Sequence, residues 1–191
     1  MAPTLSRLTL PVSALLNEAI SSFDCIGEAE AGDSVAEEVR DFLKDGDYVE
    51  GIEHGYSATY LLIDPDQRPA ELLGYITVSL DSIRLTDGEK KALGRPDFGD
   101  FGAVRIVMVG VDRRFVGRGY GGELVSAVVD FAGEIGEFVP VRFVVADANV
   151  RKQEWYEDRG FVVNRSKIEN DPEDPSPETI SMRLDLRADP D

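Results

Sequence analysis

The apolar and polar positions in the first half of the chain follow the two spacings that mark helices and strands. Residues 13–23 and 33–46 repeat apolar side chains every three to four positions, which predicts two amphipathic helices. Residues 56–64 and 72–80 are rich in β-branched and aromatic side chains and are separated by a turn of Pro and Asp, which indicates an antiparallel hairpin. Residues 4–10 show a weaker strand pattern.

In the second half of the chain, strand-like and helix-like segments alternate. Residues 103–112 form a nearly continuous apolar run, as in a central strand that is buried on both faces. A glycine-rich turn follows, and helical spacing resumes over residues 120–133. The other predicted elements are an irregular crossing over 83–102 with a short helix near 89–93, strands over 141–148, 161–168 and 179–186, a helix over 149–159, and an acidic loop over 169–178.

The order of these elements, β-α-α-β-β-β-α-β-α-β-β, predicts a mixed α/β (α+β) fold rather than a regular doubly wound one. A chain of 191 residues can bury roughly 70% of the surface that its unfolded form exposes, so it needs no disulfide or metal to hold a core. The sequence has no internal repeat and no segment typical of a linker between domains. We therefore expect a single domain over residues 1–191, with residues 187–191 as a frayed tail.

Charge is abundant and unevenly distributed. The net charge is −17, from 37 acidic and 20 basic side chains, whereas residues 105–165 hold nine of each and are neutral. An acidic surface repels nucleic acid and anionic membranes and favours cationic partners. Adaptation to high salt would explain the acid excess equally well, because there are five Lys against 15 Arg. The charge disfavours a nucleic-acid partner and leaves the cause of the acidity open.

Cysteine, histidine and hydropathy narrow the class of protein further. Cys25 is the one cysteine, so no internal disulfide can form, and with His54 as the one histidine a zinc cluster is disfavoured. The apolar runs are too short to span a bilayer, and the first residues lack the pattern of a secretory signal. We expect a cytoplasmic protein that holds no metal and does not associate with membranes.

The stretch VDRRFVGRGYGGEL, residues 111–124, concentrates glycine and arginine between the central strand and a helix. Successive backbone N–H groups at a helix N-terminus bind anions, and glycine permits the close approach that this requires. Arg114 and Arg118 can add charge-assisted contacts. A solvated glycine-rich turn is the plainer alternative. A dinucleotide site is disfavoured because its fingerprint usually lies in the first βαβ unit, and a Walker loop is excluded because no Gly-Lys-Ser/Thr follows.

A second stretch, NVRKQEWYEDRGF, residues 149–161, follows where the next strand ends. The first stretch resembles motif A of the GNAT superfamily of acetyl-CoA-dependent N-acetyltransferases, V-D-x-x-Y-Q-G-K-G-I-G-x-x-L. The second resembles its motif B, N-x-x-A-x-x-x-Y-E-x-x-G-F, with the interval from Asn149 to Tyr156 preserved. The upstream segments SFDCIGE and YSATYLLID are similar to the branch that contains toxin-like acetyltransferases acting on aminoacyl-tRNA. The resemblance covers roughly residues 20–165.

The resemblance implies a GNAT fold, a mostly antiparallel sheet of about six to seven strands with about four helices and two strands splayed at the cofactor. It implies acetyl-CoA as the acyl donor, with Val109 and Val111 pairing by backbone with the pantetheine arm beside a bulge. An N–H near Val109 would stabilise the oxyanion. The implied diphosphate site consists of Arg114, Val116, Gly117, Arg118, Gly119, Tyr120, Gly121 and Gly122, and Asn149 would cap its helix and contact the cofactor.

By the same resemblance, Tyr156 is the general acid of the reaction. The leaving thiolate needs a proton, and a phenol with a pKa near 10 is a suitable donor beside a thiol with a pKa near 8.5. A tyrosine that only packs beside Trp155 and Phe161 is the plainer alternative.

The sequence departs from the family pattern at two positions, and it leaves the base of the reaction unassigned. Val116 stands where the family has Gln or Arg, which leaves backbone donors to hold the diphosphate, and Lys152 stands where motif B has alanine. The attacking amine must be neutral, so a base or a desolvating pocket has to assist. A water relay is as good a hypothesis as any side chain, and the candidate bases are Glu50, Glu53, His54 and Asp81.

The sequence predicts an N-acetyltransferase that moves an acetyl or small acyl group from acetyl-CoA to an amine by direct attack. The acidic charge favours a cationic small molecule or a peptide as the acceptor. Two alternatives stay open. One is toxin-like acetylation of aminoacyl-tRNA, which the upstream similarity suggests and the charge opposes. The other is a non-catalytic module that binds coenzyme A. A homodimer is the family's common habit, and the sequence does not decide the oligomeric state.

Overall fold

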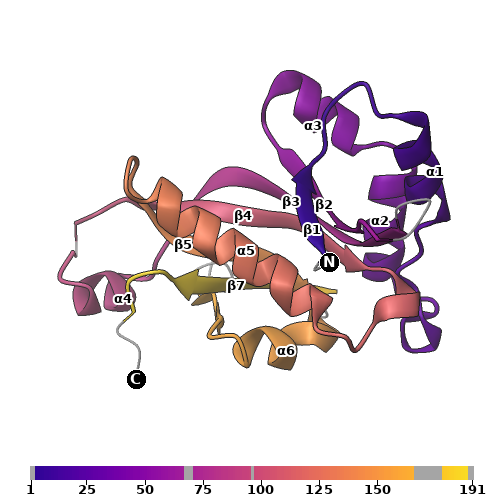
Figure 1. Ribbon diagram of the computed structural model, residues 1–191. Coiled ribbons are helices and arrows are strands. Elements are labelled where there is room, and N and C mark those ends of the chain that lie inside the picture. Colours follow the sequence, from indigo (N-terminus) through magenta and orange to yellow (C-terminus); the bar gives the residue numbers. More distant parts are fainter. Residues whose placement is uncertain (1–2, 67–70, 96, 166–177, 189–191) are drawn as a thin grey trace. The chain divides into compact units, whose positions relative to one another are not determined.

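The computed structural model describes residues 3–66, 71–95, 97–165 and 178–188. Its helices within these ranges are α1 (Ala14–Ser22), α2 (Ser34–Lys44), α3 (Tyr48–His54), α4 (Asp87–Ala92), α5 (Tyr120–Ile135) and α6 (Gln153–Glu157) (Figure 1). Its strands are β1 (Thr4–Arg7), β2 (Ala58–Asp64), β3 (Glu71–Arg84), β4 (Asp100–Val111), β5 (Val141–Asn149), β6 (Val162–Val163) and β7 (Thr179–Asp185). Short 3-10 turns occupy Glu28–Glu30, Arg113–Phe115 and Val150–Lys152.

The strands form a sheet in the order β1-β2-β3-β4-β5-β7-β6. Strands β4 and β5 are parallel, whereas β1–β2, β2–β3, β5–β7 and β6–β7 are antiparallel. This confirms the predicted mixed, mostly antiparallel α/β architecture. No helix in the described part of the chain combines the length and the apolar character needed to cross a bilayer.

The chain divides into two compact units. The first unit contains the described residues of 1–79 and 107–127, and the second contains those of 80–106 and 128–191. That the chain behaves as one domain over residues 1–191 stays a prediction.

In the first unit, helices α1 and α2 begin where the sequence supplies a cap. The Ser13 side chain accepts a hydrogen bond from the Leu16 amide at the start of α1. Asp33 caps α2, since its Oδ1 accepts from the amides of Val35 and Ala36 at 3.1 and 3.2 Å. Such caps satisfy amides that the first helical turn leaves without partners.

Helix α3 was not expected from the sequence. It has seven residues, lacks a side-chain cap, and ends at Gly55, whose φ is 72°. Its own Gly51 lowers helix propensity by roughly 1 kcal/mol relative to Ala, yet a Cβ there would lie 1.9 Å from the Ser57 Oγ. The close approach of the following chain therefore requires glycine, and tertiary packing rather than propensity forms this helix.

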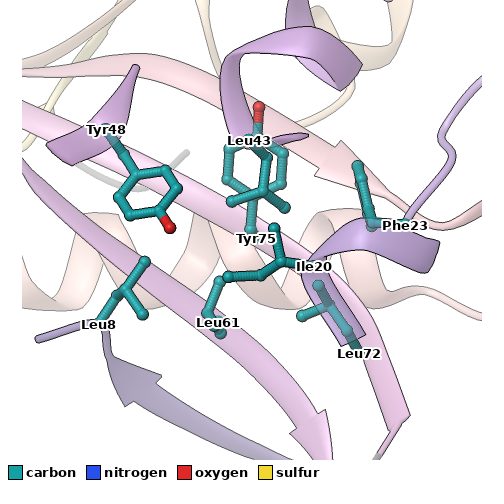
Figure 2. Packing of buried hydrophobic residues seen from close by; sticks show 8 residues of the cluster. All are labelled: Leu8, Ile20, Phe23, Leu43, Tyr48, Leu61, Leu72 and Tyr75. Atoms are coloured by element: carbon teal, nitrogen blue, oxygen red, sulfur yellow. The ribbon is translucent and has the colours of Figure 1, made fainter. Parts of the chain in front are cut away.

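The core of the first unit surrounds Tyr75 of β3. Figure 2 shows its side chains pointing toward one another from helices and strands: Leu8, Ile20, Phe23, Leu43, Tyr48, Leu61, Leu72 and Tyr75. The Tyr75 ring meets the Phe23 ring edge to face with centroids 5.4 Å apart, and its hydroxyl donates to the Val39 carbonyl of α2. Burial raises the pKa of Tyr75 well above its usual value, so this hydroxyl stays protonated.

In the second unit, β4 pairs with β5 from Gly102–Val141 to Ile106–Ala146, and β5 pairs with β7 as far as Asn149–Thr179. A Cβ on Gly102 would lie 2.2 Å from the Pro140 carbonyl oxygen, so the entry to β5 requires glycine opposite it. The core of this unit consists of Ile83, Leu85, Phe101, Ala103, Phe143 and Val145.

Helix α4 begins with a capping box, in which Thr86 and Glu89 exchange hydrogen bonds. Glu89 also accepts from Arg183 of β7, so the helix is attached to the sheet by an ion pair with limited solvent exposure. The predicted short helix near residues 89–93 is therefore present, beginning two residues earlier.

Several predicted boundaries differ from the observed ones. Strand β3 continues to Arg84 instead of ending at residue 80, because its pattern of apolar and polar residues persists past the hairpin. The predicted helix over 149–159 is a 3-10 turn followed by the five residues of α6. Of the predicted strand over 161–168, only Val162–Val163 is a strand, and residues beyond 165 lie outside the described residues. The acidic loop over 169–177 and the tail beyond residue 188 lie outside them as well.

Candidate active site

The glycine-rich turn joins β4 to α5 in the first unit. After β4 ends at Val111, Asp112 caps the 3-10 turn Arg113–Phe115, and α5 begins at Tyr120. Gly117 and Gly119 have φ values of 83° and 90°, in a region where a residue with a side chain is strained. A Cβ at either position would meet nothing within 4 Å. The turn needs glycine for its backbone angles, and the space over it is open within this unit.

Most backbone amides of the turn have no internal acceptor. The Arg118 amide donates to the Phe115 carbonyl at 3.3 Å, and the Glu123 amide donates to the Gly119 carbonyl at 3.1 Å. Among the described residues, no acceptor is found for the amides of Val116, Gly117, Gly119, Tyr120, Gly121 and Gly122. The last three are first-turn amides of a 16-residue helix, where the helix dipole favours an anion. The arrangement can bind a phosphate group by main chain alone.

The two arginines predicted to assist this site differ. Arg114 is held by carboxylates: Nε and Nη2 donate to Asp112 at 2.8 and 3.1 Å, and Nη1 donates to Glu71 at 3.0 Å. The hydrogen bond that Arg114 donates to Asp112 raises the pKa of Arg114. Arg118 has no ion pair with a described residue, and its guanidinium lies 5.1 Å from the centroid of the Phe115 ring. Arg118 is the more available of the two cations.

Sequence reasoning gave Asp112 no role, although it belongs to the V-D pair of the quoted motif. Its side chain is buried, and its backbone amide donates to the Leu73 carbonyl at 2.9 Å. Its Oδ2 accepts from the amide of Asp24, which lies 88 positions earlier in the chain. A buried acid directly before a glycine-rich turn was the available signal, but its partners could not be read from local spacing.

Residues 107–111 of β4 lead into the turn. A Cβ on Gly110 would lie 3.0–3.2 Å from Val39, Tyr75 and Phe23, so the core of the first unit packs tightly against the strand there. Val109 and Val111, on either side of it, are half-buried. The β4–β5 register shifts between Gly102 and Ala103. A bulge at Val109–Val111 and its pairing with pantetheine stay predictions.

The other predicted residues, Asn149 and Tyr156, belong to the second unit. Asn149 is the last residue of β5 and caps the 3-10 turn that precedes α6, because its side chain accepts from the Arg151 amide at 2.9 Å. The predicted capping role is confirmed, while contact with a cofactor stays a prediction.

Tyr156 is held by aromatic neighbours on α6 and beyond it. Its ring meets those of Trp155 and Phe161 edge to face, with centroids 4.9 and 5.2 Å apart, and only 5% of the residue is exposed. Burial raises the pKa of Tyr156 to about 12, opposed in part by the nearby Arg159. The phenol therefore stays protonated at neutral pH.

The Tyr156 hydroxyl accepts no hydrogen bond from a described residue and donates none. Across the described residues, no side-chain oxygen is both fully buried and without a partner. This hydroxyl oxygen therefore keeps access to solvent while its ring is enclosed, which leaves it open to a ligand.

The candidate bases are in different settings. Glu50, Glu53 and His54 are exposed on α3 in the first unit. Asp81, in the second unit, is bound by Arg105, which also donates to Asp147 at 2.6 Å. The Asp81 carboxylate is already engaged by Arg105 and the other three side chains are exposed, so the structure favours none of the four.

Two further observations concern reactive groups. Burial, and then the charge of Asp24, raises the pKa of the Cys25 thiol to about 12, so it is protonated at neutral pH and unsuited to nucleophilic attack. Within the described ranges, no three His, Cys, Asp or Glu side chains gather as a metal site would require. The expectation that the protein holds no metal stays a prediction.

Comparisons with known proteins agree with the motifs. The model of the acetyltransferase (GNAT) family matches residues 37–161. No curated protein sequence matches the chain. Among solved structures, a bacterial toxin is 21% identical, with a TM-score of 0.68 over 97% of this chain and 92% of that one.

Two other solved structures resemble the chain over nearly its whole length. A mutant of the toxin AtaT, bound to the C-terminus of the antitoxin AtaR and acetyl-CoA, is 16% identical with a TM-score of 0.69, over 98% of this chain and 96% of that one. AtaT complexed with acetyl-methionyl-tRNAfMet is 16% identical with a TM-score of 0.63, over 94% and 93%. At these identities the likeness is one of fold.

Proposed function

The chain belongs to the acetyltransferase (GNAT) family, whose model matches well over half of it, and from this premise we propose that it acetylates a primary amine by direct attack on acetyl-CoA. As a member of this family it is an acyltransferase. The amine nitrogen attacks the thioester carbon, the C–S bond breaks, and the acetyl group passes to the acceptor without a covalent enzyme intermediate. The donor carries an acetyl or another small acyl group.

The observation that carries this proposal is the row of amides at residues 116, 117 and 119–122 that have no acceptor among the described residues. A diphosphate offers several anionic oxygens to such a row, and Arg118 adds a positive charge beside it. The exposed side chain of Val116 contributes no polar contact, so the backbone carries the binding at that position. Residues Val109 and Val111 then hold the pantetheine arm by their backbone groups, with an N–H near Val109 stabilising the oxyanion.

Tyr156 is the proposed general acid. Its hydroxyl, which has no partner among the described residues, supports this role, and its raised pKa keeps the phenol protonated at neutral pH, so a proton is available for the leaving thiolate. The proton that the attacking amine loses goes to a base or water that we leave unassigned. Asn149 completes the set by fixing the start of the segment that carries Tyr156.

The acidic surface supports a cationic small molecule or a basic peptide as acceptor, because net charge of −17 attracts cations and repels polyanions. The test is a screen for acetyl-CoA turnover against polyamines, aminoglycosides, amino acids and peptide N-termini, at low and high salt. Turnover with a cationic amine, weakened by salt, is expected. Binding of acetyl-CoA with no turnover across the panel would favour a non-catalytic coenzyme A-binding module instead.

A second candidate acceptor is the amine of an aminoacyl-tRNA. The full-length likeness to AtaT, whose complex with acetyl-methionyl-tRNAfMet is known, favours it, whereas the acidic charge opposes it. Expression in a translating cell extract separates the two. Arrest of translation that is relieved by Tyr156→Phe supports the tRNA acceptor, and normal translation beside active acetylation of small amines supports the first.

A further inference from the structure

The Asp112 carboxylate lies at the junction of β4 and the glycine-rich turn and is 1% exposed. An ionised carboxylate in such a place is costly unless it is paired and hydrogen-bonded. The Asp112 carboxylate accepts four hydrogen bonds within the first unit. The Arg114 amide donates at 3.0 Å, its Nε and Nη2 donate at 2.8 and 3.1 Å, and the Asp24 amide donates at 3.3 Å.

We infer that Asp112 is a positioning residue of the cofactor site, because through Arg114 it fixes the turn whose free amides face the diphosphate. The inference depends on the proposed function, since it assigns Asp112 a role in holding that same ligand. Asp112 itself does not touch the ligand. It determines where the turn begins and in which direction the following amides point.

Few other bonds constrain this turn. Between the 3-10 turn and α5, the glycine-rich turn has a long hydrogen bond of 3.3 Å from the Arg118 amide to the Phe115 carbonyl. Two residues of this segment are glycines with positive φ. The entry, in contrast, is held on both sides of Asp112. Its amide donates to the Leu73 carbonyl at 2.9 Å, and its carbonyl accepts from the Phe115 amide at 2.8 Å. A ligand that meets an already ordered turn does not have to order it, so pre-organisation raises affinity.

The residue between Asp112 and Arg114 attaches the turn to a second segment. Arg113 donates its amide to the Asp24 carbonyl at 2.8 Å, and its guanidinium lies 3.4 Å from the Asp24 carboxylate. The turn is thus attached to the segment between α1 and the 3-10 turn Glu28–Glu30. Because Asp112 and Glu71 already engage Arg114, Arg118 is left as the charged side chain for the ligand.

The test compares dissociation constants for coenzyme A and for its nucleotide part, 3′-phospho-ADP, in the parent protein and in Asp112→Asn. The asparagine has the same shape but lacks the charge and one acceptor. We expect both constants to rise by the same factor, at least about tenfold, because the diphosphate is common to both ligands. In turnover, the loss appears in the KM for acetyl-CoA, with a smaller change in kcat.

Asp100→Asn is the matched control. Asp100 accepts two bonds of 2.9 and 3.3 Å from the guanidinium of Arg84, but the pair is exposed and lies at the start of β4, whereas the turn follows the end of that strand. This variant should bind coenzyme A like the parent. If Asp112→Asn does not fold, Arg114→Lys replaces it. That variant keeps the positive charge of a half-exposed side chain while breaking its two-bond fork, and it should weaken both ligands in the same way.

Outcomes separate the two claims. Should the parent fail to bind coenzyme A, the proposed function fails. Should the parent bind while Asp112→Asn and Arg114→Lys bind equally well below their melting temperatures, Asp112 is only structural and the inference is overturned. A loss for coenzyme A without an equal loss for 3′-phospho-ADP also overturns it, because the defect would then lie outside the diphosphate turn.

Discussion

Replacing Tyr156 with Phe removes a single oxygen from a ring that stays packed. The hydroxyl bonds to no other described residue, and the ring contacts with Trp155 and Phe161 do not involve it. No hydrogen bond to a described residue is lost, so the free energy of unfolding should change by less than about 0.5 kcal/mol. The variant therefore isolates chemistry from stability.

The expected catalytic effect of Tyr156→Phe follows from the role of a general acid, which contributes about 10²- to 10⁴-fold in rate. We expect kcat to fall about 100-fold, equivalent to about 2.7 kcal/mol of transition-state stabilisation. Affinity for acetyl-CoA should stay unchanged. The kcat is measured from the release of the coenzyme A thiol, monitored continuously with an acceptor from the amine screen. The affinity for acetyl-CoA is measured by calorimetric titration.

Tyr75→Phe is the matched control for Tyr156→Phe, since it makes the same chemical change at another enclosed tyrosine. The Tyr75 hydroxyl donates to the Val39 carbonyl, so its removal takes one hydrogen bond from an oxygen within helix α2. This control should lose about 1 kcal/mol of stability and keep its kcat. Full activity in Tyr156→Phe, or an equal loss of kcat in Tyr75→Phe, would refute the assignment of the acid.

Three other predictions follow. Because the pKa of Tyr156 is raised to about 12, the phenol keeps its proton over the pH range in which the acceptor amine becomes neutral. The kcat/KM should therefore rise between about pH 7 and pH 10. A decline within that range would mean that the general acid has a lower pKa. Acetyl-CoA at about 100 times its dissociation constant should stabilise the parent by about 2.7 kcal/mol in thermal unfolding. Gly119→Glu should abolish this gain, because Gly119 has a φ of 90° and the new carboxylate repels phosphate; a retained gain would contradict the amide site. Because the pKa of the Cys25 thiol is about 12, Cys25 should be alkylated at pH 8 orders of magnitude more slowly in the folded chain than in the unfolded chain. Mass spectrometry measures both rates. Equal rates would place the thiol at the surface.

Features that depend on neighbouring residues could be predicted from the sequence. The hairpin, the central strand, the glycine-rich turn and the helix after it follow from local spacing, and the family follows from two motifs in the right order. The caps at Asp33 and Asn149 also belong here, because a capping side chain bonds to amides two or three positions away.

Features that depend on residues far apart in the chain could not be predicted from the sequence. Local patterns treat Arg114 and Arg118 alike, yet Asp112 and Glu71 engage the first and leave the second available. Helix α3 forms because a following segment packs against Gly51, despite its weak helical signal. The sequence by itself determined the family, the order of the strands and the residues worth examining. The tertiary structure decided which of those groups are already paired and which stay open, because pairing depends on partners such as Asp24 and Asp112, 88 positions apart, that meet only in the folded chain.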